Sequence, residues 1–565
     1  MKTEKLSHKI EYITLAFILI LYAWKAYPIS NSLVPYDSSD FSAHIFKIWF
    51  VSENNLSGWN PYWYGGSTLF KQYPPLAYLI PASFTSTGLY LSYYIFFDIV
   101  WLMIPLALFI FFKNFNLTKI QTSVALIISS MFPGSLVFFR NSNLPFITSF
   151  LFSILFLIYF KKSIENKTNW TKPAVLLISV LLSHILMAGL LYLSVIVWFL
   201  STYPNKQKIY SLLPIFIIPV LIVSFWYIPF SYGIYSGREG GLSVVSDPIG
   251  YTTFTANQRL ETMGIPTEIF LFFAAATTLS ILATFIEFRS KLFRQFLPWL
   301  LIAALLFTIL DYKRIVILMP IPISMLVCLN LNKKHLHIFT ALLIISSILV
   351  FSSFSMSFRQ TAEYPETGNR VVFYDEEKTC HGCSFFSAYL PAIKGNEIIN
   401  GWLPQSQNTN SLFEKRGPFL KEIMDPISIS HDEFNKLAKA SMLNYIVVSS
   451  NSTEILDYFR KNVAFSFLKE ENGFSIFKSK EDFSYIEIDS KQVKTDVKKF
   501  NSKITALFDC SPGTLTIKET YDKDWKIKIN GGQNPYRIND YGFIESDLKI
   551  AGECTLEMYY QQSFF

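Results

Sequence analysis

The sequence predicts a polytopic α-helical membrane protein that carries, at its C-terminal end, an exported domain of mixed α/β and β-sandwich structure. Hydrophobic residues make up 51% and aromatic residues 17% of the 565 positions, a composition typical of chains that insert into a bilayer. Apolar segments fill the first two-thirds of the chain, whereas charged and amide side chains become frequent after about residue 357. We therefore expect a transmembrane domain over 1–356 and a soluble domain over 357–565.

Apolar segments that could cross a bilayer recur about eleven times in the first region. The stretch from Pro173 to Tyr203 is too long for one upright helix, so we divide it near His184. The expected spans are 11–30, 91–112, 118–139, 143–160, 173–184, 187–203, 209–230, 267–287, 295–311, 313–330 and 336–356.

Lysine and arginine gather in every second connection between these segments, for example within 161–172 and 289–294. Positive charge in short loops marks the cytoplasmic side of a membrane protein. We therefore expect a multi-pass protein of the cell membrane with a cytoplasmic N-terminus. The loops 31–90 and 231–266 and the region after Met356 would then be extracytoplasmic.

The expected exported domain has two parts. Asp432–Ser441 has a helical pattern, and Tyr445–Val448 is typical of a buried strand. From Thr505 onward the pattern indicates antiparallel strands, with Asn530-Gly531-Gly532 as a hairpin signal. We expect mixed α/β structure over 357–500 and a small β-sandwich over 501–565.

Cysteine usage agrees with this placement. Cys328 lies within a span, and the other four cysteines follow residue 357, an even number that suits an oxidising compartment. We expect Cys510 to pair with Cys554 across the terminal strands and Cys380 to pair with Cys383 locally. A zinc or redox site at Cys380-His381-Gly382-Cys383 is the alternative.

The connection between the first two segments holds the residues to which we assign chemistry. Asp37, Asp40 and His44 lie near its start, and the last two are four positions apart, so they share one face of a helix. A carboxylate can take a proton from a hydroxyl group and make it a nucleophile. The aromatic remainder of the loop suits a segment at the membrane surface. We therefore predict acid–base chemistry on a lipid-borne substrate within residues 31–90.

A structural role for the same residues is the alternative. Ser and Asp are common at helix N-termini, so Asp37 or Ser38 would only cap an interfacial helix that runs through Phe50. His44 would then be a surface residue.

Several short motifs lie along the chain. In the first loop they are Asp40-x-x-x-His44, Gly58-Trp59-Asn60-Pro61, Gly65-Gly66 and Tyr73-Pro74-Pro75, and in the C-terminal region they are Gly401-Trp402-Leu403-Pro404, Leu443-Asn444-Tyr445-Ile446-Val447-Val448 and the ending from Tyr521 through Trp525 to Ala551-Gly552. With these motifs the loop resembles the first outer loop of polytopic membrane glycosyltransferases of the GT-C fold. The likeness is to YfhO-type chains and to membrane proteins called 6-pyruvoyl-tetrahydropterin synthase-related, and it covers most of the chain. It implies a GT-C-like arrangement of the helices.

The resemblance implies a transferase that takes a sugar from a polyprenyl-phosphate carrier and passes it to a glycan, lipid or protein acceptor outside the cytoplasm. In GT-C enzymes an acid of the first outer loop is the catalytic base or a metal ligand, a role that falls to Asp40 first and Asp37 second. Attack opposite the lipid phosphate would invert the anomeric centre. A divalent ion, Mg²⁺ or Mn²⁺, is one option, but Arg140-Asn141-Ser142-Asn143 lacks the second acid of many such enzymes, which favours catalysis without metal.

The leaving phosphate needs positive charge nearby. Lys313 and Arg314 stand at the expected outer end of two spans, against the positive-inside tendency, and snorkelling beside Asp311 is the alternative. His184 and Asp98 lie in apolar segments, where they either line a cavity or make hydrogen bonds between helices. Together with His184, the further candidates for binding lipid phosphate or substrate are Arg140, Arg238, Arg259 and Tyr73.

Two other functions are compatible with these patterns. A transporter or flippase would move lipid-linked sugars without making a bond, although the hydrophobic pattern shows no internal repeat. A non-catalytic assembly factor would bind a cell-surface polysaccharide through residues 357–565. The net charge of +7 is spread over short clusters between apolar segments, so no nucleic-acid partner is expected. The expected partners are the lipid-linked sugar, its acceptor and membrane lipids.

Overall fold

The chain forms two units in the computed structural model. The first unit is Met1–Phe41, Pro74–Ser224 and Gly240–Gln360, and the second is Ser42–Tyr73, Phe225–Glu239 and Thr361–Phe565. The structure describes residues 9–28, 33–35, 40–54, 59–63, 66–68, 74–132, 136, 139, 142–166, 170–202, 212–224, 226, 266–284, 296–298, 300–301, 319–328, 331, 337–354, 358–360, 370–374, 390–399, 423, 425–500 and 502–561.

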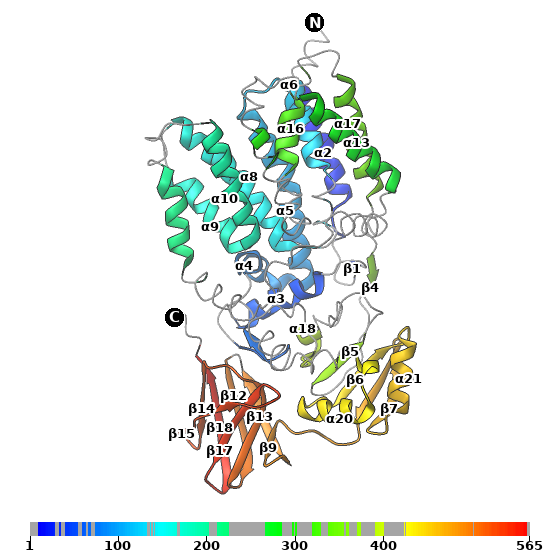
Figure 1. The fold of residues 1–565 in the computed structure, drawn as a ribbon, viewed down its shortest axis with the longest axis vertical. Helices are drawn as coiled ribbons and strands as arrows, with labels where there is room; N and C mark the ends of the chain where they lie inside the picture. Colours follow the sequence, from blue (N-terminus) through cyan, green and yellow to red (C-terminus); the bar gives the residue numbers. More distant parts are fainter. Residues whose placement is uncertain are drawn as a thin grey trace. The chain divides into compact units, whose positions relative to one another are not determined.

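The described part of the first unit is helical (Figure 1). Helix α5 packs against α2, α6 and α8, α8 also packs against α9, and α13 packs against α16 and α17. A short antiparallel pair joins β1 (Leu33–Pro35) to β4 (Phe358–Gln360). The helices are α2 (Ile10–Trp24), α4 (Leu76–Ala82), η1 (Thr85–Thr87), α5 (Leu89–Lys113), α6 (Lys119–Ser130), α8 (Leu144–Asn166), α9 (Thr171–Ser183), α10 (Ile185–Thr202), α13 (Thr267–Thr284), α16 (Pro320–Val327) and α17 (His337–Ser353), with a further apolar helix at Leu212–Ser224.

Local signals account for several helix ends. Thr118 and Gln121 form a reciprocal capping box at the start of α6, in which each side chain accepts from the other residue's backbone N–H. His184 has an extended backbone and separates α9 from α10, so the break expected there is confirmed. Two described helices, α5 and α8, are long and apolar enough to cross a bilayer, and the other apolar helices in the described ranges are shorter. The expected count of about eleven spans is not confirmed.

The second unit begins with α3 (Phe41–Asn54) and a short ribbon of β2 (Trp59–Asn60) and β3 (Ser67–Thr68). A four-stranded sheet follows, in the order β5-β6-β8-β7, with β5 and β6 parallel. Phe459 of α21 packs on this sheet and against Phe434 of α20, which covers one face with aromatic rings. The elements are β5 (Val371–Tyr374), α18 (Leu390–Lys394), η7 (Pro426–Ser428), α20 (His431–Ala440), β6 (Tyr445–Ser449), α21 (Thr453–Lys461), β7 (Phe465–Glu471) and β8 (Phe474–Ser479).

The helix expected at Asp432–Ser441 and the buried strand expected at Tyr445–Val448 are therefore confirmed, as α20 and β6. Ser430 caps α20 by accepting from the backbone N–H of Glu433, which explains the start of that helix.

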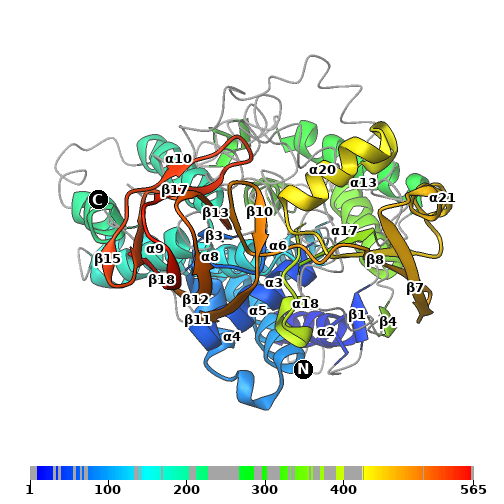
Figure 2. The same ribbon diagram turned by 90° about the horizontal axis from the view of Figure 1, so that it is seen from below.

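Two five-stranded sheets form the β-sandwich in the described C-terminal part, and their strands can be followed in Figure 2. The orders are β10-β9-β13-β17-β16 and β11-β12-β18-β14-β15, and inward side chains of both sheets share one apolar core. The strands are β9 (Ile486–Ile488), β10 (Lys491–Val493), β11 (Thr495–Phe500), β12 (Lys503–Cys510), β13 (Gly513–Thr520), β14 (Trp525–Ile529), β15 (Gly532–Gln533), β16 (Arg537–Ile538), β17 (Phe543–Leu548) and β18 (Gly552–Tyr560).

Two features of the last strands agree with the sequence-based predictions. Asn530 and Gly531 both have positive φ and form the tight turn between β14 and β15, as the hairpin signal predicts. A disulfide joins Cys510 of β12 to Cys554 of β18, the pair expected from the sequence. Cys380 and Cys383 lie outside the described residues.

The expected domain boundaries differ from those of the structure in two places. The sandwich begins at Ile486 and not at 501, because β10 and β11 are edge strands whose exposed lysines hide the apolar alternation of a sheet. The second unit also takes in Ser42–Tyr73, which the sequence assigned to the membrane domain. The reason is the packing of Trp59 and Trp63 among residues far along the chain.

Candidate functional site

The acid that the sequence singled out stands at the start of a helix. Asp40 directly precedes α3, and its side chain is partly exposed. The Nδ2 group of Asn143 donates to Asp40 Oδ2 over 3.0 Å. The negative charge of this carboxylate complements the N-terminus of the helix, and the Asn143 amide orients one of its oxygens.

Asn143 is held in a single orientation by helix α8, which begins at the next residue. Its Oδ1 accepts from the backbone N–H of Phe146 over 3.3 Å, the hydrogen bond of an N-terminal cap. Because the oxygen of the amide is used by the helix, the NH₂ group is the one directed at Asp40.

The turn that precedes Asn143 is fixed by two tyrosines. Tyr93 donates from its hydroxyl to the carbonyl of Ser142 over 2.9 Å, and Tyr27 donates to the carbonyl of Phe139 over 2.9 Å. Ser142 itself has a φ of 55°, a left-handed conformation that an L-residue adopts only when its surroundings hold it there. Asn143 is thus presented to Asp40 by a preorganised turn.

The Asn143 N–H group occupies one acceptor position of Asp40 Oδ2. In the described ranges, no three His, Cys, Asp or Glu side chains converge in a way that could hold a metal ion.

The other predicted site residues are placed as follows. His44 lies in α3 and is 1% exposed, so it is a buried residue and not the surface residue of the alternative reading. His184 Nδ1 accepts from the backbone N–H of Met187 over 3.4 Å, and its ring meets Phe146 edge-on, so it stabilises the start of α10. Asp98 accepts from the backbone N–H of Tyr27 over 3.0 Å, a contact between α5 and the end of the α2 segment. Outside the described residues lie Asp37, Tyr73, Arg140, Arg238, Arg259, Lys313 and Arg314.

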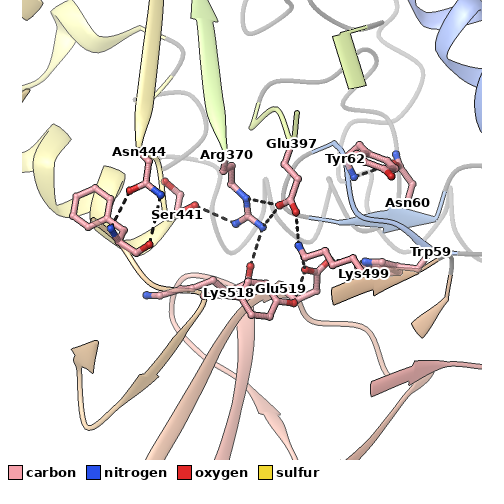
Figure 3. Close-up of polar contacts among 12 residues, drawn as sticks. Trp59, Asn60, Tyr62, Arg370, Glu397, Ser441, Asn444, Lys499, Lys518 and Glu519 are labelled. Atoms are coloured by element: carbon pink, nitrogen blue, oxygen red, sulfur yellow. Dashed lines mark hydrogen bonds and ion pairs between the residues drawn. The ribbon is translucent and has the colours of Figure 1, made fainter. Parts of the chain in front are cut away.

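Sequence reasoning missed a buried group of charges in the second unit, drawn in Figure 3. It connects the residue before β5, the segment after α18, and strands β11 and β13. Arg370 donates to Glu397 Oε2 from Nη2 over 3.0 Å. Lys499 Nζ lies 2.7 Å from Glu397 Oε1 and 3.1 Å from Glu519 Oε2. We call these four residues the charge cluster.

The charge cluster has its hydrogen bonds completed by neighbouring groups. Arg370, which is fully buried, also donates to the carbonyls of Ser441 and Lys518, each over 3.1 Å. Glu519 accepts from Tyr485 Oη over 2.8 Å. Buried charges persist only when paired and hydrogen-bonded in this way.

The electrostatics of the charge cluster follow from this pairing. Partial burial opposes ionisation of Glu397, but the nearby Lys499 ammonium and Arg370 guanidinium outweigh it and hold the pKa of that carboxyl below its ordinary value. Burial, with the negative charge of Glu519 beside it, raises the pKa of Tyr485. Glu397 is therefore ionised and Tyr485 is neutral at neutral pH.

Trp59 of the predicted catalytic loop belongs to this part of the molecule. Its Nε1 donates to Glu519 Oε1 over 2.6 Å, and its ring centroid lies 5.0 Å from that of Trp525 and 4.9 Å from that of Tyr560. Trp59 is fully buried and Trp63 is 2% exposed, stacked on Phe46. The expectation that these rings lie at the membrane surface is therefore wrong for both, because the protein core buries them.

Gly66, from the Gly65-Gly66 motif, is explained by the same packing. It has a φ of 115°, and a Cβ atom there would collide with the indole of Trp59 and with the Glu519 carboxylate. The signal that could have revealed the cluster was Glu519 itself, a charge within a β-type run whose neighbours are buried.

The chain shares the GT-C fold, as the resemblance implied.

Two solved structures illustrate this likeness. The arabinofuranosyltransferase AftD from Mycobacteria aligns with 98% of this chain and 60% of its own, at 10% identity and a TM-score of 0.58. The archaeal oligosaccharyltransferase AglB from Archaeoglobus fulgidus, solved with an inhibitory peptide and a dolichol-phosphate, aligns with 79% of this chain and 70% of its own, at 11% identity and a TM-score of 0.50. The chain thus spans less than two-thirds of AftD. No protein-family model and no curated protein matches the chain, so the likeness to YfhO-type proteins stays a prediction.

Proposed function

We propose that this protein is a membrane glycosyltransferase that transfers a sugar from a polyprenyl-phosphate carrier to an acceptor outside the cytoplasm. The observation that most supports this proposal is the carboxylate of Asp40, which the Asn143 amide holds at the start of a helix in a chain with the GT-C fold. AftD is an arabinofuranosyltransferase, which supports sugar transfer, and AglB was solved with a dolichol-phosphate, which supports a lipid-linked donor.

The proposed reaction is a single displacement with Asp40 as general base. The carboxylate takes the proton of the acceptor hydroxyl, and the oxygen attacks the anomeric carbon. The bond from that carbon to the phosphate oxygen breaks, and the polyprenyl phosphate leaves with the electron pair. Attack from the opposite face inverts the anomeric centre.

The remaining predicted residues take supporting roles in this proposal. Lys313 and Arg314 would neutralise the leaving phosphate, with Arg140, Arg238 and Arg259 as further cations and Tyr73 as a contact to the substrate. Asp37 is the second choice for the base. His44, one helical turn after Asp40, would assist it. The proposed topology has a cytoplasmic N-terminus, because the positive clusters in alternate connections mark the inner side.

The test is Asp40→Asn, with Glu53→Gln as the matched control because Glu53 is an exposed acid on the same helix. Cells that lack the gene are complemented with each variant, and mass spectrometry compares their surface glycans and lipid-linked sugars. We expect Asp40→Asn to lower transfer by about 10²–10⁴-fold and to accumulate the lipid-linked donor, while Glu53→Gln restores the wild-type pattern. Unchanged transfer with Asp40→Asn at normal protein level would exclude Asp40 as base and leave Asp37 as the candidate.

A further inference from the structure

The second unit contains a cleft that the proposed reaction does not use. Its volume is about 810 Å³, within the range of sites that take small organic ligands. It is lined by Tyr62, by Glu397 and Lys499 of the charge cluster, and by Asp482, Gln492 and Lys494. All of these residues belong to the second unit.

The charge cluster forms one wall of this cleft. The side chains of Glu397 and Lys499 are 18% and 15% exposed, so they keep a polar edge toward the cleft while their ion pair stays in place. Their positions are set by Arg370 and Glu519, which are fully buried (Figure 3). A carboxylate and an ammonium fixed side by side offer one acceptor and one donor to a hydroxyl-bearing ligand.

The charges on the cleft are balanced. Glu397 and Asp482 carry negative charge, and Lys494 and Lys499 carry positive charge. A ligand with a strong net charge of either sign would meet a like charge on one side, which opposes its binding. Balanced charges suit a neutral ligand that forms many hydrogen bonds.

The remaining lining groups fit the same chemistry. Gln492 lies on the edge strand β10 and is exposed, so its amide can both donate and accept. Tyr62 is half-buried, and its ring packs edge-on against Trp49, which holds it in place at the cleft. Aromatic rings with amide and carboxylate groups around them bind the apolar faces and the hydroxyls of sugars, since each group meets its complement.

We propose that this cleft is a binding site for a neutral oligosaccharide. If the proposed function holds, this oligosaccharide is the acceptor of the transferred sugar. The binding of the oligosaccharide does not depend on that function. The cleft contains no residue assigned to the reaction at Asp40.

The test is calorimetric titration of the full chain in lipid nanodiscs. The probes are linear tetrasaccharides of glucose, mannose, galactose or arabinofuranose, with a tetrasaccharide of galacturonic acid as the charged counterpart. We expect at least one neutral probe to bind with a Kd below about 1 mM, and the acidic probe to bind more weakly.

Two neighbouring substitutions give the matched comparison. Gln492→Ala, in the cleft, is expected to weaken binding at least about tenfold, or about 1.4 kcal/mol. Lys491→Ala alters the adjacent exposed residue of β10, which points to the other face of the strand and does not line the cleft, and is expected to leave binding unchanged. Neither changes the buried charge cluster, so thermal unfolding should match the wild type.

Three results would overturn the inference: no neutral probe binds at about 5 mM, the acidic probe binds best, or both variants bind like the wild type. Asp40→Asn separates this inference from the proposed function, because it should lower transfer by about 10²–10⁴-fold and leave binding in the cleft unchanged. If the protein transfers sugar but binds no neutral probe, the cleft proposal is wrong and the proposed function stands.

Discussion

At the scale of single residues, the contact between Asn143 and Asp40 is the most informative feature. Many GT-C enzymes carry a second acid in the segment that here reads Arg140-Asn141-Ser142-Asn143. An amide stands in that segment and donates to Asp40 while capping α8. Asn143 is therefore a positioning residue in our proposal, since it orients the base without touching the reacting atoms.

Two substitutions at Asn143 separate these tasks. Asn143→Ser can still cap α8 through its hydroxyl, but it does not reach Asp40, so we expect transfer to fall about tenfold at unchanged stability. Asn143→Asp places a second carboxylate beside Asp40, and two like charges at that distance raise the pKa of the pair. The acidic limb of the pH–rate profile should then move to higher pH, as measured by transfer from pH 4 to pH 8.

The position of that limb distinguishes a positioning role from a structural one. If both variants transfer sugar at the wild-type rate and with the wild-type pH–rate profile, the Asn143 amide has no part in the reaction.

At the scale of elements, the ribbon of β2 and β3 is part of the second unit's core. Trp59 of β2 fills the space between Trp525 and Tyr560 and pairs with Glu519. The ribbon thus completes the β-sandwich, although more than four hundred residues separate it from these partners: Trp59 and Glu519 are 460 positions apart.

Gly66→Ala should disrupt this packing. The added Cβ meets the Trp59 indole and the Glu519 carboxylate, and the positive φ adds strain, so we expect a loss of about 2–5 kcal/mol in stability. Gly552→Ala is the control, because Gly552 has a φ of 105° but open space around its Cα. Denaturant unfolding of both variants, followed by tryptophan fluorescence, measures the difference. Equal losses would mean that strain alone matters and that the close approach does not.

At the scale of the whole molecule, the charge cluster links pH to stability. The folded-state pKa of Glu397 lies below its ordinary value because of Lys499 and Arg370. Above the unfolded-state pKa of about 4.3, the cluster contributes its full stabilisation. As the pH falls from that value through the lower folded-state pKa of Glu397, the stabilisation is lost.

Glu397→Gln should remove part of this acid sensitivity. It leaves Arg370 and Lys499 without one carboxylate, so we expect a loss of about 3–5 kcal/mol at pH 7 and a flatter stability curve between pH 5 and pH 3. Asp457→Asn breaks an exposed pair with Arg460 and should change neither quantity measurably. Chemical unfolding of the full chain at several pH values checks both. If the unfolding free energy of Glu397→Gln depends on pH as it does in the wild type, other carboxyl groups cause the acid sensitivity.

The sequence by itself determined the features that depend on neighbours along the chain. The break at His184, the helix α20, the strand β6 and the turn at Asn530-Gly531 all follow from periodicity, caps and turn residues within a few positions. The GT-C fold was predicted by the resemblance of the motifs in the first loop to those of known proteins.

Only the tertiary structure decided which distant residues meet. Asp40 and Asn143 are 103 positions apart, and the carboxylate of Glu519 finds its indole partner 460 positions away. A buried charge is stable only when a partner of opposite charge or a hydrogen-bond donor lies beside it. Because that partner is distant in the sequence, no local pattern identifies the pair. For that reason Trp59, which we expected at the membrane surface, lies in a protein core, and the partners of Glu519 were not predicted.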